Sequence, residues 1–144
     1  MNKTACWGLA VVLAAVLGAA PAAALPSQTS NEAGIQPVSW DAWLAAKAKA
    51  EKHDAEGNLV AALQYYLEYM RQARGLNSPV RVAWGMNNAA YMIIKMHRTD
   101  PTVDLEPARK LLEDGLAIPQ ASEDCRKIMA MNLEHVRSRL ERAR

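Results

Sequence analysis

The chain has 144 residues, including 17 Lys or Arg and 15 Asp or Glu, and its formal net charge is only +2. This slight basicity, without a basic cluster that alternates with aromatic residues, argues against nucleic acid as a partner. Phe is absent while Ala, Leu, Met, Glu, Lys and Arg dominate, which excludes collagen, a disulfide scaffold and a disordered tail and indicates an all-α protein.

Residues 1–24 have the pattern of an export signal. Lys3 precedes an apolar run from Ala5 to Leu17, and the small residues 22–24 offer a site for signal peptidase. The apolar run is shorter than the roughly 20 residues that a membrane-spanning helix needs, so we expect cleavage rather than a retained anchor. The sequence therefore predicts a periplasmic or secreted bacterial protein with no membrane span after cleavage.

Residues 25–38 are polar, contain two prolines and show no apolar period, which predicts a flexible leader. The remaining residues, 39–144, resolve into five helical stretches. Ser39 can cap the first stretch, and Gly57 ends it.

The second stretch covers residues 58–73, and Gly75 can adopt the left-handed conformation that stops a helix. Ser78 followed by Pro79 is a strong start signal for the third stretch, because Pro is favoured as the first residue of a helix. This third helix is expected to end before residue 99.

The fourth stretch covers about residues 104–116, and Ser122 caps the last one. Apolar side chains of the last stretch recur every three or four residues: Cys125, Met129, Leu133, Val136 and Leu140. Such a stripe faces a core. We therefore expect Cys125, the only cysteine after the signal, to be a small buried residue rather than a nucleophile.

Residues 57–66 resemble the middle of a tetratricopeptide repeat (TPR), which is a hairpin of two helices. In that family a Gly opens the turn, a small residue lets the helices approach, and an aromatic residue fills the space beneath. Here these residues are Gly57, Ala62 and Tyr66. The small residue of the preceding helix would be Ala50.

A second hairpin resembles the versions of this repeat that contain Asn-Asn-x-Ala. Residues 87–90 lie in its first helix, and Ala108 and Leu112 take the small and large positions of its second helix. The same spacing puts a further small residue at Ala130. It follows Ala90 by 40 residues, a little above the roughly 34 typical of the repeat.

Three features depart from the repeat pattern. Lys49 and His53 stand where a large apolar residue and a Tyr are expected, and the turn around residues 97–103 is longer. The resemblance implies a right-handed solenoid of about two and a half degenerate repeats, closed by a C-terminal capping helix. A five-helix bundle with a chance spacing of Ala residues is the alternative.

The resemblance also implies where a partner would bind. In this family the first helix of each hairpin contributes to a concave face that contacts peptides. Carried over, that face receives Leu44, Lys47, Glu51, Trp84, Asn87, Asn88, Tyr91, Lys95, Asp124, Lys127, Met131 and His135. We therefore expect a protein or peptide partner, held by amides and aromatic faces. Interior packing is the alternative role for Trp84 and Tyr91.

Some members of the family hold a terminal carboxylate between cations and amides. Lys47 and Asn88 match two of the positions involved, but Glu51 replaces an Asn, and Asp124 and Ile128 replace basic residues. This pattern disfavours capture of an anion at those positions.

No motif of a catalytic or phosphate-binding site stands out, and we predict no catalysis, no cofactor and no metal site. His53 and Asp54, for example, point about 100° apart on one helix. The runner-up prediction is a small helical ligand-binding bundle or enzyme with a pocket around Trp84, Tyr91 and His97. Association into a homo-oligomer is left open.

Overall fold

The computed structural model describes residues 36–143, so the predicted signal and residues 25–35 of the predicted leader lie outside the described part. Residues 36–143 form five helices and no strand: α1 (Trp40–Ala55), α2 (Leu59–Gly75), α3 (Pro79–Thr99), α4 (Glu106–Leu116) and α5 (Glu123–Arg142). The predicted all-α class is confirmed for this part of the chain. None of these helices is both long enough and apolar enough to cross a bilayer.

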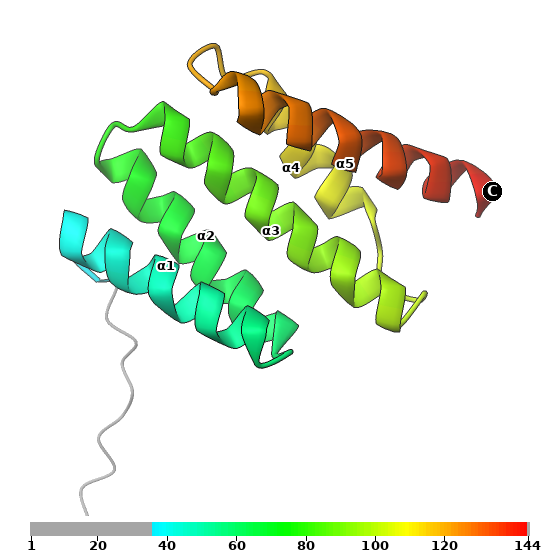
Figure 1. The fold of residues 1–144 in the computed structure, drawn as a ribbon, viewed down its shortest axis with the longest axis horizontal. Coiled ribbons are helices and arrows are strands. Elements are labelled where there is room, and N and C mark those ends of the chain that lie inside the picture. Colours follow the sequence, from blue (N-terminus) through cyan, green and yellow to red (C-terminus); the bar gives the residue numbers. More distant parts are fainter. Residues whose placement is uncertain (1–35, 144) are drawn as a thin grey trace, which may run out of the picture. The chain divides into compact units, whose positions relative to one another are not determined.

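Each helix packs against the next one along the chain, and α3 also contacts α5 (Figure 1). Side chains start three of the helices as N-caps. Ser39 Oγ accepts a hydrogen bond from the Ala42 amide at 3.0 Å, and Ser122 Oγ accepts one from the Cys125 amide at 3.3 Å. Both caps were predicted from the sequence, and Asn58 caps α2 in the same way.

The turn between α2 and α3 differs from the prediction. Gly75 is the last residue of α2, and the left-handed conformation belongs to Asn77, whose φ is 52°. Gly75 is required for another reason, since a Cβ there would lie 2.6 Å from a methyl group of Val38. Ser78 precedes α3 but makes no capping bond, and its hydroxyl accepts a hydrogen bond from Arg81.

The last residues of the predicted leader contact α2. Gln72 of α2 is fully buried, and its amide donates to the carbonyl of Pro37 at 3.2 Å and accepts from the amide of Ser39 at 3.0 Å. The carbonyl of Gln36 accepts a hydrogen bond from Arg71 at 2.6 Å. Residues 36–38, which the sequence assigns to the leader, therefore contact α2 through polar groups that a sequence pattern does not reveal.

The largest core cluster lies between α3, α4 and α5. Its most deeply buried large side chains are Ile94, Leu112, Met129 and Val136, each at most 1% exposed. Cys125 is fully buried in the same cluster, as predicted. The stripe of α5 that was predicted from its spacing therefore faces this core.

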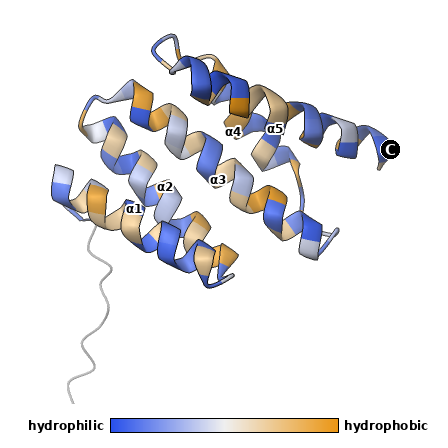
Figure 2. Cartoon of the chain, in the orientation of Figure 1, coloured by the Kyte–Doolittle hydropathy of each residue, from blue (hydrophilic) through white to orange (hydrophobic). Residues whose placement is uncertain are grey.

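Small residues mark the closest helix contacts. Ala50, Ala62, Ala90 and Ala108 are all 0% exposed. Ala130 is different, because it is exposed and no helix within residues 36–143 packs on its side of α5. Hydrophilic residues dominate the ribbon of α5, whereas α3 alternates between hydrophobic and hydrophilic residues (Figure 2).

Candidate functional site on α1, α3 and α5

One stripe of α3 carries the residues that the sequence singled out most sharply. Trp84, Asn88, Tyr91 and Lys95 follow at intervals of four, three and four residues, which places them on one side of the helix. All four are partly buried. Trp84 packs against the cluster of α3, α4 and α5, and Tyr91 packs against the cluster that joins α1, α2 and α3. These two aromatic residues therefore contribute to packing while keeping part of their surface in solvent.

Cations flank the ring of Tyr91. The Lys95 ammonium lies 5.6 Å and the Arg98 guanidinium 5.9 Å from the ring centroid, within the range of a cation–π interaction. Lys95 also forms an ion pair with Asp54 of α1. The pair joins α1 to α3 across 41 positions of the sequence, which no local pattern predicts.

Amides join α3 to α5. Asn87 is only 5% exposed, and its Oδ1 accepts a hydrogen bond from Asn132 Nδ2 at 3.0 Å. Asn87 in turn donates to Asn88 Oδ1 at 3.2 Å. Asn87 and Asn132 thus lie at the contact between α3 and α5, which we call the seam. Within residues 36–143, the Nδ2 group of Asn88 makes no hydrogen bond and can donate to a ligand.

The neighbouring stripe of α5 is apolar and exposed in its middle. Ile128 is 40% and Met131 is 72% exposed, and His135, one turn further on, is partly buried. Lys127 is exposed and pairs with Glu123 at 2.7 Å. The predicted residues Met131 and Lys127 are therefore both at the surface, but the lysine has an acidic partner of its own.

The α1 part of the predicted face is polar. Lys47 Nζ lies 2.5 Å from Glu51 Oε1, and both side chains are about half exposed. Burial raises the pKa of Tyr66 to about 12, and the carboxylates of Glu51 and Asp54 add to the shift. Both carboxylates are paired with lysines, Glu51 with Lys47 and Asp54 with Lys95, so this part of the face presents ion pairs.

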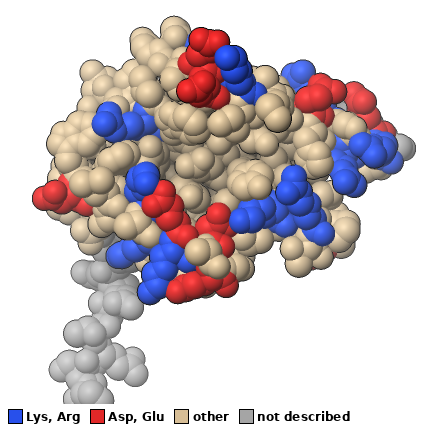
Figure 3. Space-filling view, viewed as in Figure 1, with Lys and Arg blue, Asp and Glu red and all other residues tan. Residues whose placement is uncertain are grey.

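At the other end of the face, Arg81 joins the beginnings of α3 and α1. Its guanidinium lies 4.7 Å from the ring centroid of Trp40 and 5.0 Å from that of Trp43. Figure 3 shows charged side chains around the margin of this side of the molecule and a largely uncharged centre over α3.

The residues of the runner-up pocket are not brought together in this way. His97 Nδ1 lies 2.8 Å from the carbonyl oxygen of Val103, so the imidazole holds the turn between α3 and α4. It follows Tyr91 by six residues and therefore points to another side of α3. Trp84 and Tyr91 remain on one stripe without His97.

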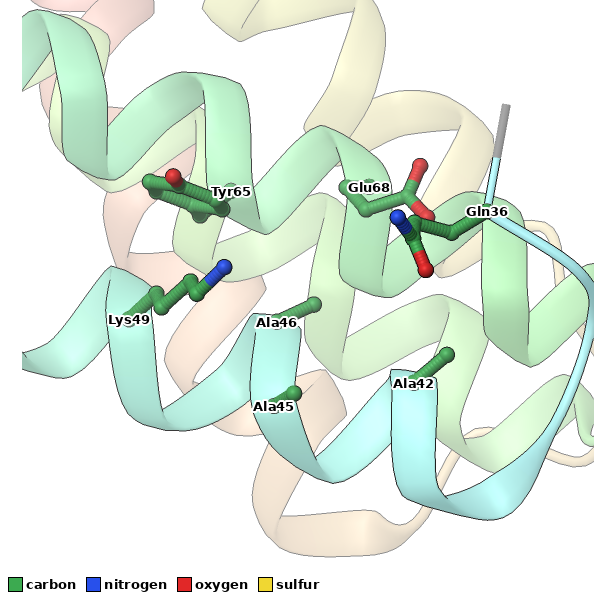
Figure 4. A pocket seen from close by; sticks show the side chains of 7 residues that line it. All are labelled: Gln36, Ala42, Ala45, Ala46, Lys49, Tyr65 and Glu68. Atoms are coloured by element: carbon green, nitrogen blue, oxygen red, sulfur yellow. The ribbon is translucent and has the colours of Figure 1, made fainter. Parts of the chain in front are cut away.

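A second candidate site lies between α1 and α2 (Figure 4). This pocket has a volume of about 160 Å³, and its lining consists of Gln36, Ala42, Ala45, Ala46, Lys49, Tyr65 and Glu68. The Lys49 ammonium lies 5.3 Å from the centroid of Tyr65, while Glu68 already bonds to Arg71 at 2.7 Å. The pocket is small, and no local sequence pattern predicts it.

Comparisons with protein-family models, with curated proteins and with solved structures found no match to the chain. The candidate site is therefore described by its own residues. The sequence did not predict a role at this site for Asp54, Asn132, Arg98, Arg139 or Arg142. Only the periodicity of α5 could have placed the last two beside His135.

Proposed function

We propose that residues 39–144 form a short, right-handed stack of TPR-like hairpins. In this arrangement α1–α2 and α3–α4 are two repeats, and α5 is the first helix of an incomplete third repeat. The complete burial of Ala50, Ala62, Ala90 and Ala108 supports this arrangement, because these are the small positions of the repeat pattern. The exposure of Ala130 supports the role of α5 as a cap, since a cap has no second helix to cover it.

The function that fits this arrangement is capture of an extended peptide or protein segment on the concave face made by α1, α3 and α5. The single observation that carries the proposal is the pairing of two stripes. The α3 stripe offers partly exposed aromatic rings and the free amide of Asn88, and α5 beside it exposes Ile128 and Met131. An amide can bond a peptide backbone while apolar side chains hold its side chains.

Such a module needs no chemical step of its own, because binding alone would bring its partner into place. The predicted export signal makes the periplasm the proposed compartment. The proposed partner is a peptide or protein segment in that compartment.

Site-specific photocrosslinking in the native host tests the proposal. A benzophenone amino acid replaces Met131 on the proposed face or Val60 on α2, which is 59% exposed and serves as the matched control. We expect crosslinks to a partner at position 131 and few at position 60, with mass spectrometry identifying the attached segment. Equal crosslinking at the two positions would contradict the proposed face.

A further inference from the structure

We infer that the seam between α3 and α5 ends in a binding site for carboxylates, so that the captured segment carries acidic groups at that end. The inference rests on the proposed peptide-binding function and specifies its ligand. The site consists of Arg98 at the end of α3 and His135, Arg139 and Arg142 on α5.

The geometry follows from the two helices. α3 and α5 contact each other and run in the same direction, so their last turns lie at the same end (Figure 1). On α5, His135, Arg139 and Arg142 follow at intervals of four and three residues and continue the stripe of Ile128 and Met131. The exposed apolar middle of the seam therefore leads directly to the cationic end.

Arg98, Arg139 and Arg142 differ from most lysines and arginines of the described residues, because they have no acidic partner. Lys47, Lys95 and Arg109 all lie within 4.0 Å of a carboxylate, as do five further lysines and arginines: Lys52, Arg71, Lys110, Lys127 and Arg137. Among residues 36–143, no such ion pair involves Arg98, Arg139 or Arg142. Arg142 bonds only to the carbonyl and hydroxyl oxygens of Ser138.

Within residues 36–143, none of the nearby acids forms an ion pair with the arginines of this cluster. Asp100, which follows α3, accepts hydrogen bonds from the amide and the hydroxyl of Thr102. Glu134 and Glu141 lie about 100° or more around α5 from His135 and point away from the stripe. The cluster therefore keeps donors that can meet a ligand carboxylate, and guanidinium groups bind carboxylates in a bidentate manner.

His135 responds to the surrounding charge. Burial lowers its pKa, and the positive charges of Arg98, Arg139, Arg142 and His97 lower it further. A carboxylate bound among these groups would favour the protonated imidazole and raise the pKa again. His135 is thus a built-in reporter for the occupied site.

The beginning of α5 would determine the orientation of a ligand bound along the seam. Glu123 and Asp124 lie in the first turn of α5, where acidic groups are favoured by the helix dipole. Glu123 is paired with Lys127, but Asp124, four residues before Ile128 on the same stripe, would repel an acidic segment that bound the other way round. The acidic end of the ligand should therefore lie over the last turns of α3 and α5, with its apolar part over Ile128 and Met131.

Binding of short synthetic peptides to the purified protein tests the inference. The probe is an acetylated, C-terminally amidated peptide ending in Leu-Ala-Glu-Glu, and its control ends in Leu-Ala-Gln-Gln. A free-acid form of the control separates a terminal carboxylate from side-chain carboxylates. We expect the acidic peptide to bind about tenfold more tightly than its amidated glutamine control, which corresponds to about 1.4 kcal/mol, and to raise the pKa of His135 in an NMR titration.

The variants Arg98→Gln and Arg139→Gln should each remove most of the preference for the acidic peptide and leave the affinity for the glutamine control unchanged. Arg74→Gln is the matched control, because Arg74 is an exposed arginine of α2 that forms no ion pair within residues 36–143. Melting curves of all three variants show whether they are folded. Higher salt should weaken the acidic peptide more than its control.

Three outcomes would overturn the inference. The first is equal binding of the acidic and amidated glutamine peptides with NMR shifts on α3 and α5, which would leave the peptide-binding function intact. The second is an equal loss of affinity in Arg74→Gln and Arg139→Gln. The third is self-association that shifts the pKa of His135 without peptide. If, in addition, the crosslinker at position 131 captures nothing, then both the carboxylate site and the proposed peptide-binding function are contradicted.

Discussion

The two hairpins use the same small residues at their closest contacts but fill the remaining space differently. In α3–α4, large aliphatic and methionine side chains from three helices fill the core, and Leu112 and Met129 are fully buried. In α1–α2 the buried residues are mainly alanines and tyrosines. Polar groups cover its aromatic surface, for His53 stacks on Tyr65 with ring centroids 5.4 Å apart and an angle of 3°.

This difference indicates which interactions stabilise each hairpin. The second hairpin depends on filled volume, since a missing side chain leaves a cavity in a dense core. The first depends on the close approach of helix backbones and on polar contacts at its edges. The two regions should therefore respond to opposite kinds of substitution.

The largest effect is expected from shortening a side chain in the second hairpin. Leu112→Ala removes a fully buried side chain and should lower the free energy of unfolding by about 2–5 kcal/mol. Chemical denaturation followed by circular dichroism measures the change. Leu67→Ala on α2, where the side chain is 40% exposed, should cost far less. A similar cost at both positions would contradict the volume-filled core.

Enlarging a side chain should be the sensitive change in the first hairpin. Ala62 is 0% exposed at the contact with α1, and Ala62→Trp should destabilise the protein by about 1–3 kcal/mol through overpacking. Ala61 is partly exposed one position further round the helix, so Ala61→Trp should shift the melting temperature much less. Equal shifts would argue against a small-residue contact at position 62.

The smallest effect concerns the polar edge of the first hairpin. Gln72→Leu removes the hydrogen bonds to residues 36–39 and should cost about 1 kcal/mol, because water can replace some of these bonds. Hydrogen exchange at the Ser39 amide, which donates to Gln72, should accelerate. Gln64→Leu, at an exposed position of the same helix, is the control. Unchanged protection of Ser39 in Gln72→Leu would rule out this anchoring role.

The part of the fold that depends on local sequence could be predicted. Helix bounds agree to within two residues where they were given, and the caps Ser39 and Ser122 are confirmed, because a cap acts on an amide three positions away. The role of Gly75 could not be predicted. Its neighbour Val38 lies far away in the sequence, and only the folded chain brings the two together.

The same distinction holds for the candidate site. Helical periodicity placed Trp84, Asn88 and Tyr91 on one stripe, but it could not separate Asn88 from Asn87. The separation comes from α5, whose Asn132 bonds to Asn87 at 3.0 Å. The grouping of Arg98 with Arg139 and Arg142 around His135 could not be predicted, because it depends on how α3 and α5 pack. The unpaired state of those cations depends on contacts between helices.

The amide seam between α3 and α5 has a consequence for how the protein would behave in a changing medium. Asn87 and Asn132 carry no charge and do not titrate, so neither acid nor salt weakens the bond that fixes the spacing of the two helices. The ionic contacts at the margin, such as the pair of Lys95 and Asp54, are screened as ionic strength rises. Acidity and salinity would therefore adjust how strongly a ligand is held while the shape that receives it stays constant.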